Sequence, residues 1–333
     1  MATNPVRWGI IGCGDVTEVK SGPAFTKAHG SALVAVMRRT PGLAEDYARR
    51  HGVARWYDGA EALVQDADVD AVYVATPPAS HEAYTQLAAR HGKPVYVEKP
   101  MATSHAACVA MIEACRSAGV PLFTAYYRRA LPRFLKVKAL IDEGTIGDIR
   151  ALTVSLTRRT LDAGGQMPWR VDPQIAGGGL FVDLASHTLD LLDFIIGPIA
   201  SVAGGAGNQG GLYRAEDIVS AAFAFETGVR GTGLWCFTAD RDADIVDIIG
   251  TRGRVSFSTF DEAPVVLESA GGRESFAVPH PPHVQQPLIQ TIVDQLRGEP
   301  GACPSTGETG ARTSRVMDAL LQSYYERSAA HDG

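Results

Sequence analysis

Residues 6–17 read VRWGIIGCGDVT, and this stretch decides the fold of the first part of the chain. Val6 to Ile11 form an apolar run typical of a buried strand, and a glycine loop follows where a helix is expected to begin. Gly12 permits a tight turn, and Gly14 lets the backbone approach a phosphate held by amides at the helix start. The pattern predicts a strand–loop–helix unit that binds a dinucleotide, although Thr17 replaces the usual third glycine or alanine.

The residues after this loop alternate between short apolar runs and helical patterns. Further strands are expected at residues 33–37, 71–75, 95–97 and 122–125, with helices at residues 41–51, 81–91 and 104–119. Glycine at or near the end of each predicted helix is typical of a helix C-terminus. This alternation predicts βαβ units and a doubly wound parallel sheet of the Rossmann type.

The pattern changes after Tyr127. We expect a helix at 131–143, a strand at 149–158 and then a loop with Gly and Pro at 162–179. Further strands are expected at 218–225, 229–237, 245–250, 255–258 and 265–269. Two helices, at 285–297 and 306–330, are expected to end the pattern. Short strands joined by tight turns are typical of an antiparallel sheet. The α/β fold we expect has a Rossmann domain at 1–127. An α+β domain with a large, mostly antiparallel open sheet follows at 128–333.

Composition excludes several classes of protein. The chain of 333 residues has 31 Lys and Arg against 37 Asp and Glu, without a block of like charge, so nucleic-acid binding is not expected. No apolar run reaches the roughly 20 residues needed to cross a bilayer, so a membrane span is not expected. The five cysteines are scattered and predict neither disulfides nor a zinc site. The first five residues leave no room for a signal peptide, so a cytoplasmic protein is expected.

Residues 177–190, GGGLFVDLASHTLD, form a second informative stretch. The three glycines are expected to be flexible, and the helical spacing places Asp183 and His187 on one face. A polar stripe on a surface helix is the alternative. A metal site that also includes Asp190 is not expected, since Asp190 lies on the more apolar part of the helix and a catalytic zinc commonly needs three ligands.

Ligands bind outside the carboxyl ends of the strands in an open parallel sheet. That rule selects the residues that follow each of five predicted strands. In strand order they are Gly12, Cys13, Gly14, Asp15 and Val16; Arg38 and Arg39; Thr76, Pro77 and Pro78; Glu98, Lys99 and Pro100; Tyr126 and Tyr127. We expect these residues to line the cofactor and substrate site. The alternatives are stiffened loops for the prolines and an ordinary surface position for Lys99.

Arg38 and Arg39 bear on the choice of cofactor. An NAD site usually offers an acidic residue at the end of the second strand, where this chain has two arginines. Guanidinium groups match a 2′-phosphate through charge-assisted contacts. We therefore expect NADP(H) to be preferred, with NAD(H) possible; two arginines that merely begin a solvated loop are the alternative.

Taken in order, these motifs resemble the glucose–fructose oxidoreductase, inositol dehydrogenase and MocA family (Gfo/Idh/MocA). The similarity extends over essentially the whole chain, and also includes His81 after the two prolines and the pair Trp169 and Arg170. The resemblance implies a catalytic set of Lys99, Asp183 and His187, and often a cis peptide between Lys99 and Pro100. It adds His81, Tyr126, Trp169 and Arg170 near the cofactor, and implies a homodimer or homotetramer formed through the C-terminal sheet.

The function implied is hydride transfer between NADP(H) and a carbinol or carbonyl carbon of a sugar, polyol or small ketone. His187 would exchange the hydroxyl proton and Lys99 would stabilise developing alkoxide charge. Asp183 would orient Lys99 or His187, or bind a substrate hydroxyl. Further substrate contacts are expected from Tyr127, Arg158, Trp169 and Arg170. Two alternatives stay open: nicotinamide-dependent glycoside cleavage without net redox change, and a non-catalytic nucleotide-sensing regulator.

Overall fold

The computed structural model describes residues 4–160 and 167–331. Residues 162–166 of the predicted loop lie outside the described residues. The chain divides into two compact units: residues 1–131 with 281–311, and residues 132–280 with 312–333.

The first unit is built on a six-stranded sheet in the order β3-β2-β1-β4-β5-β6, with every neighbouring pair parallel. The strands are β1 (Val6–Ile11), β2 (Ser31–Met37), β3 (Arg55–Tyr57), β4 (Ala71–Val74), β5 (Val95–Val97) and β6 (Leu122–Thr124). The chain reverses its direction of winding between β1 and β4, and this reversal places a ligand crevice beyond their carboxyl ends. The predicted Rossmann sheet is confirmed; the short edge strand β3 was not predicted.

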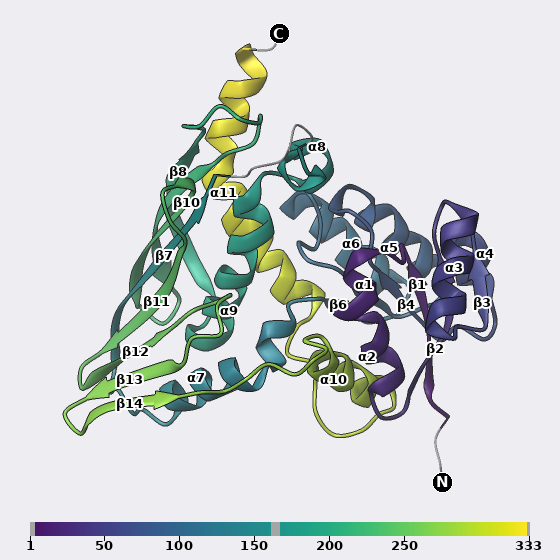
Figure 1. Cartoon of the computed structure of the whole chain (residues 1–333), viewed down its shortest axis with the longest axis horizontal. Helices are drawn as coiled ribbons and strands as arrows, with labels where there is room; N and C mark the ends of the chain where they lie inside the picture. The colour runs from purple at the N-terminus through teal and green to yellow at the C-terminus, as the bar shows by residue number, and fades with distance from the viewer. Residues whose placement is uncertain (1–3, 161–166, 332–333) are drawn as a thin grey trace. The chain divides into compact units, whose positions relative to one another are not determined.

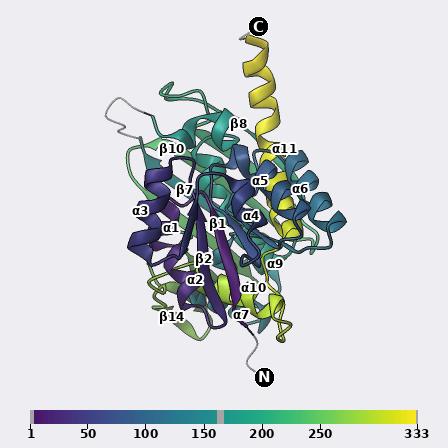
Figure 2. The same ribbon diagram turned by 90° about the vertical axis from the view of Figure 1, so that its right-hand side faces the viewer.

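Helices cover both faces of this sheet (Figure 2). They are α1 (Asp15–Val19), α2 (Gly22–Lys27), α3 (Pro41–His51), α4 (Ala60–Gln65), α5 (His81–Arg90), α6 (His105–Ser117) and α10 (Gln286–Leu296). One face carries a row of buried rings in which Trp8 packs on Phe25, Phe25 on Tyr73, and Tyr73 stacks on Tyr96 at 4.8 Å between centroids. The other face is aliphatic and packs against α4, α5 and α6. Burial on both faces explains why these strands are continuous apolar runs.

The second unit contains an eight-stranded sheet in the order β14-β13-β12-β11-β7-β10-β9-β8 (Figure 1). Its strands are β7 (Ile149–Arg159), β8 (Ile199–Gly207), β9 (Ile218–Phe225), β10 (Arg230–Ala239), β11 (Ala243–Gly250), β12 (Gly253–Phe257), β13 (Val265–Ser269) and β14 (Gly272–Phe276). β7 and β10 pair in parallel and the other neighbours are antiparallel. The expected large, mostly antiparallel sheet is thus confirmed. β8 and β14 were not predicted, because β8 is rich in Ala and Gly and β14 is almost fully exposed.

Alternating burial along the strands gives this sheet one covered face. Val154, Trp235, Phe237 and Val246 are among the buried side chains of that face. The helices of the unit are α7 (Pro132–Asp142), α8 (Pro173–Ala176), α9 (Ser186–Ile196) and α11 (Gly307–His331), the last of which begins in the first unit. Figure 1 shows α7, α9 and α11 on the same side of the sheet. The outward side chains of the central strands are not covered by these helices.

The compact units differ from the predicted ranges of 1–127 and 128–333. Residues 281–311 belong with the Rossmann sheet because α10 buries Leu288, Ile289, Ile292 and Val293 there. The Gln285 side chain accepts a hydrogen bond from the Tyr96 hydroxyl at 2.8 Å. Sequence periodicity identified this helix but carries no information about which sheet it covers.

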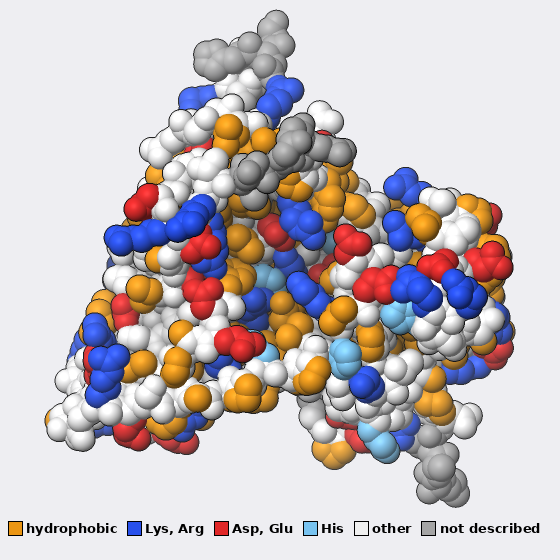
Figure 3. Space-filling model, viewed as in Figure 1, with side chains coloured by type: hydrophobic (Ala, Val, Ile, Leu, Met, Phe, Trp, Pro, Cys, Tyr) orange, Lys and Arg blue, Asp and Glu red, His pale blue; other side chains and the backbone are white. Residues whose placement is uncertain are grey.

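Charged side chains of both signs are interspersed on the face of the molecule shown in Figure 3. Among the residues that the structure describes, no helix is long and apolar enough to cross a membrane.

Two helix glycines provide a test of this packing. A Cβ at Gly22 would lie 2.1 Å from the Thr17 carbonyl oxygen and 2.3 Å from the Tyr47 hydroxyl, whereas a Cβ at Gly42 would meet nothing within 4 Å. Gly22→Ala should lower the free energy of unfolding by about 1–3 kcal/mol through overpacking. Gly42→Ala should raise it by up to about 1 kcal/mol. Urea unfolding measures both, and equal effects at the two positions would contradict the described packing of α1 and α2.

Candidate functional site

The glycine loop between β1 and α1 is closed by Thr17. Its hydroxyl accepts a hydrogen bond from the Gly14 N–H at 2.9 Å and donates to the Gly14 carbonyl at 2.8 Å. Gly12 has a φ of 92°, and a Cβ there would lie 2.5 Å from the Thr76 side chain. The departure from the usual third glycine therefore has a structural role, because the threonine fixes the turn that the glycines make possible.

Space is left open beside this loop. A Cβ at Gly14 would have its nearest neighbours at 3.9 Å, among them Arg38 Nη1. Arg38 follows β2 and donates from Nη1 to the Cys13 carbonyl at 3.3 Å, while Arg39 is exposed. A close backbone approach flanked by a guanidinium fits a nucleotide phosphate. These residues therefore fit the dinucleotide that the glycine loop predicts.

Cys13 lies inside this loop and is buried. Burial raises the pKa of its thiol to about 11. The neutral thiol is a poor nucleophile near neutral pH, so Cys13 contributes its backbone to the loop and not a reactive sulfur.

His81 joins two of the loops that follow the parallel strands. The ring is fully buried, with Nε2 2.7 Å from the Thr76 carbonyl oxygen and Nδ1 3.1 Å and 3.2 Å from those of Pro100 and Met101. Burial lowers the pKa of His81, which favours the neutral ring. Each ring nitrogen thus lies within hydrogen-bonding distance of a backbone carbonyl oxygen, and a neutral imidazole donates from one of the two nitrogens. The His81 ring therefore contacts the backbone of both the Thr76 loop and the Pro100 loop.

Glu98 is buried in the same region. Its Oε1 accepts hydrogen bonds from the Tyr73 hydroxyl at 2.5 Å and from Gln285 Nε2 at 2.6 Å, and its Oε2 accepts from the Lys99 N–H at 3.0 Å. The Lys99–Pro100 peptide is cis, as the resemblance implied. Glu98 therefore holds the backbone of Lys99, which is itself half-buried directly beyond the carboxyl end of β5.

The remaining predicted residues of the first unit follow the same strand ends. Pro77 is exposed and Pro78 is buried, while Tyr126 and Tyr127 are buried after β6. The direct contact with a cofactor predicted for Glu98, His81 and Tyr126 stays a prediction. For the first two, the hydrogen bonds described above indicate a supporting role.

The stretch with three glycines is closely packed in the structure. A Cβ at Gly178 would lie 2.4 Å from Val182 Cγ2, and one at Gly179 would lie 2.7 Å from the Glu216 carbonyl oxygen. Gly177 ends α8 with a φ of 83°. A side chain at Gly178 or Gly179 would therefore meet neighbouring atoms, and the turn at Gly177 needs a positive φ, so the packing favours glycine at all three positions.

Asp183 lies in a π-helical turn, Phe181–Ala185, which runs directly into α9. π-helical turns are rare and occur frequently at functional sites. The Asp183 carboxylate pairs with Arg170 at 3.5 Å between Oδ2 and Nε, and the Arg170 guanidinium lies 4.6 Å from the Trp169 ring centroid. The structure thus brings together three of the residues that the sequence selected in the second unit.

His187 is a buried residue in the first turn of α9. Its ring meets the edge of Phe260 with centroids 6.0 Å apart, and the Arg158 guanidinium lies 5.8 Å from the same phenyl ring. Arg158 also pairs with Asp261 at 3.7 Å. Phe260 therefore links His187 to Arg158.

Phe260 was not selected from the sequence, although it follows β12 in the way that the other candidates follow their strands. The turn that carries it is held by Asp244, whose carboxylate accepts the Phe260 N–H at 2.6 Å and the Ser258 hydroxyl at 2.5 Å. Thr188 of α9 donates to Thr259 at 3.1 Å. The rule of strand ends applies to parallel sheets, and β12 is antiparallel to both of its neighbours, so that rule does not select Phe260.

Lys99 belongs to one compact unit, and Asp183 and His187 belong to the other. Within residues 4–160 and 167–331, no three His, Cys, Asp or Glu side chains form a group that could hold a metal ion. Asp190, considered above as a third ligand, is buried in α9.

Comparison with known proteins covers nearly the whole chain. A family profile described as the oxidoreductase family with an NAD-binding Rossmann fold matches residues 6–126, and the GFO/IDH/MocA C-terminal domain matches residues 134–256. Oxidoreductase P35 of Formosa agariphila is 40% identical over 95% of this chain and 98% of its own length. The 1,5-anhydro-D-fructose reductase of Ensifer adhaerens is 29% identical over 91% of this chain and 92% of its own.

Among solved structures, the WlbA dehydrogenase from Bordetella pertussis in complex with NADH and UDP-GlcNAcA superposes with a TM-score of 0.80. It is 26% identical, and the match covers 96% of this chain and 95% of that one.

Proposed function

This chain belongs to the GFO/IDH/MocA family of nicotinamide-dependent oxidoreductases, and from that premise we propose that it transfers a hydride between NADP(H) and a carbinol or carbonyl carbon of a sugar, polyol or related small molecule. The observation that carries the proposal is the arrangement at the carboxyl edge of the parallel sheet. Three features lie just after strand ends there: the open space beside Gly14 follows β1, the Arg38 guanidinium follows β2, and Lys99 follows β5.

The nicotinamide cofactor supplies the hydride acceptor or donor when it is bound. In the oxidative direction, His187 accepts the proton of the substrate hydroxyl as the carbinol becomes a carbonyl, and it returns that proton in the reductive direction. Lys99 stabilises the negative charge that develops on the oxygen.

Substrate contacts are proposed for the groups that surround these residues. Asp183, paired with Arg170, is suited to accept a hydrogen bond from a substrate hydroxyl. Tyr127 and Arg158 complete the proposed set, and the Phe260 ring between Arg158 and His187 adds an apolar surface for a sugar or polyol carbon chain.

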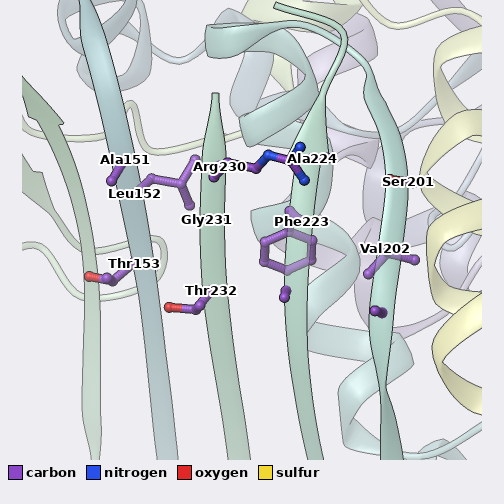
Figure 4. Close-up of a pocket in the computed structure, with 12 residues that line it drawn as sticks. Ala151, Leu152, Thr153, Ser201, Val202, Phe223, Ala224, Arg230, Gly231 and Thr232 are labelled. Atoms are coloured by element: carbon purple, nitrogen blue, oxygen red, sulfur yellow. The ribbon is translucent and has the colours of Figure 1, made fainter. Parts of the chain in front are cut away.

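Self-association is proposed through the outer face of the eight-stranded sheet. Leu234 of β10 and Ile245 of β11 are both paired in register with Ser155 of β7, and both are exposed, at 40% and 49%. A shallow pocket of about 460 Å³ lies across β7, β8, β9 and β10, with small side chains such as Thr153 and Thr232 on it (Figure 4). Exposed apolar groups on a flat face of small side chains suit packing against a second copy.

The cofactor preference is tested by fluorescence titration of the protein with NADPH and NADH. Arg38→Asp should raise the Kd for NADPH by about 10–100-fold, because a charge-assisted phosphate contact contributes about 1.5–3 kcal/mol, and should leave the Kd for NADH within about threefold. Arg90→Asp makes the same change of charge at an exposed position on α5. Equal weakening of both coenzymes by Arg38→Asp would contradict the proposed 2′-phosphate contact.

The proposed proton transfer is tested with the best substrate from a screen of sugars, polyols and small ketones for coenzyme turnover. His187→Asn should lower kcat by roughly two to four orders of magnitude while NADPH binding is kept. Near wild-type turnover by this variant would refute the role of His187. Conversion of a glycoside by the wild-type enzyme without net change of coenzyme would favour the bond-cleaving alternative.

The proposed interface is tested by light scattering coupled to size exclusion. Ile245→Asp should weaken self-association at least about tenfold, because it buries a carboxylate in an apolar contact. Leu135→Asp on α7, at a side chain that is 44% exposed, provides the control. An unchanged mass distribution for Ile245→Asp would rule out this face as the interface.

A further inference from the structure

Glu216 is a buried carboxylate behind the π-helical turn that carries Asp183. The residue is fully buried, and burial raises the pKa of its side chain. Its Oε1 accepts a hydrogen bond from the Gly179 N–H at 2.8 Å, and its Oε2 accepts one from the Tyr325 hydroxyl at 2.5 Å. Tyr325 lies on α11, so the carboxylate ties the end of that helix to the glycine segment.

Gly179 connects this carboxylate to Asp183. The Gly179 carbonyl accepts a hydrogen bond from the Asp183 N–H at 3.2 Å. Gly179 is therefore bonded to Glu216 through its N–H and to Asp183 through its carbonyl. A side chain is excluded at this position, since a Cβ at Gly179 would lie 2.7 Å from the Glu216 carbonyl oxygen and 2.9 Å from Ala215 Cβ. Glu216 thus holds Gly179, two residues before the π-helical turn, through a hydrogen bond to its N–H.

We propose that Glu216 is a positioning residue that sets the location of the Asp183 carboxylate through Gly179. The inference rests on the proposed function, which places Asp183 in the substrate site. Glu216 itself does not touch the reacting groups in this proposal. Tyr325 supports it by satisfying the second carboxylate oxygen, so that the buried charge has a donor on each side.

Three substitutions separate positioning from a merely stabilising role. Glu216→Ala leaves the buried Gly179 N–H without its acceptor. Glu216→Gln keeps both contacts, because the amide oxygen accepts from Gly179 and the amide nitrogen donates to the Tyr325 oxygen. The matched control is Asp217→Ala: Asp217 is equally buried and accepts the N–H groups of Gln209 and Gly210 at 2.7 Å each.

Hydrogen exchange of the intact protein, followed by mass spectrometry of peptides, gives a readout that does not need activity. Glu216→Ala should speed exchange in peptides covering residues 178–187 by about tenfold or more, and Glu216→Gln by less than about threefold. Asp217→Ala should instead speed exchange around residues 208–211. Unchanged exchange at 178–187 in folded Glu216→Ala would overturn the proposal.

Kinetics with the best substrate from the screen provide the second readout. Glu216→Ala should lower kcat by about tenfold or more with KM changed less than about threefold, and Glu216→Gln should restore most of the loss. If Asp183→Ala lowers kcat and Glu216→Ala does not, the positioning role is refuted. If Asp183→Ala has no effect either, the proposed function of Asp183 fails, and the exchange result stands independently.

A milder variant covers the case in which Glu216→Ala does not fold. Tyr325→Phe removes one donor from the carboxylate and should speed exchange at 178–187 by about threefold. Wild-type exchange in this variant, together with wild-type kcat, would overturn the inference.

Discussion

The position of Lys99 depends on one buried carboxylate. Glu98 accepts hydrogen bonds from Tyr73 of β4, from Gln285 at the start of α10 and from the Lys99 backbone. An ionised carboxylate without donors would be costly in this interior, so these three groups must stay in place together. Because Gln285 also binds Tyr96, the interaction couples the row of aromatic rings to the loop that carries Lys99. The same network joins Gln285, at the start of α10, to the first sheet, in addition to the apolar packing of that helix.

The second unit repeats this arrangement with different residues. Glu216 accepts one backbone N–H at the start of the segment that carries Asp183 and one tyrosine hydroxyl from a distant helix. In both units a buried acid fixes the backbone beside a candidate site residue, and the candidate residue itself remains at least partly accessible. Separate residues are needed for the two tasks, because a side chain that binds a ligand cannot at the same time hydrogen-bond to the buried groups that hold the backbone.

Sequence patterns predicted what depends on local regularity. The parallel strands, the antiparallel sheet and the strand ends that carry Arg38 and Lys99 follow from apolar runs and glycine positions. The role of Thr17, the tight packing of Gly178 and Gly179, and the return of residues 281–311 to the first unit depend on contacts between residues far apart or on one side-chain geometry. The π-helical turn at Asp183 has no distinct sequence pattern, because its apolar spacing is the same as that of an ordinary helix over so short a segment.

The geometry around Asp183 and His187 also separates their chemical roles in the proposed mechanism. Asp183 is paired with Arg170, and a carboxylate next to a guanidinium is an acceptor of hydrogen bonds, suited to orient a hydroxyl. His187 instead packs against an aromatic ring, with the centroids of the His187 and Phe260 rings 6.0 Å apart. Proton exchange near neutral pH is the chemistry for which imidazole is suited and a paired carboxylate is not. In the proposed mechanism the ion pair with Arg170 therefore suits Asp183 to orienting a hydroxyl, and the imidazole suits His187 to exchanging the proton.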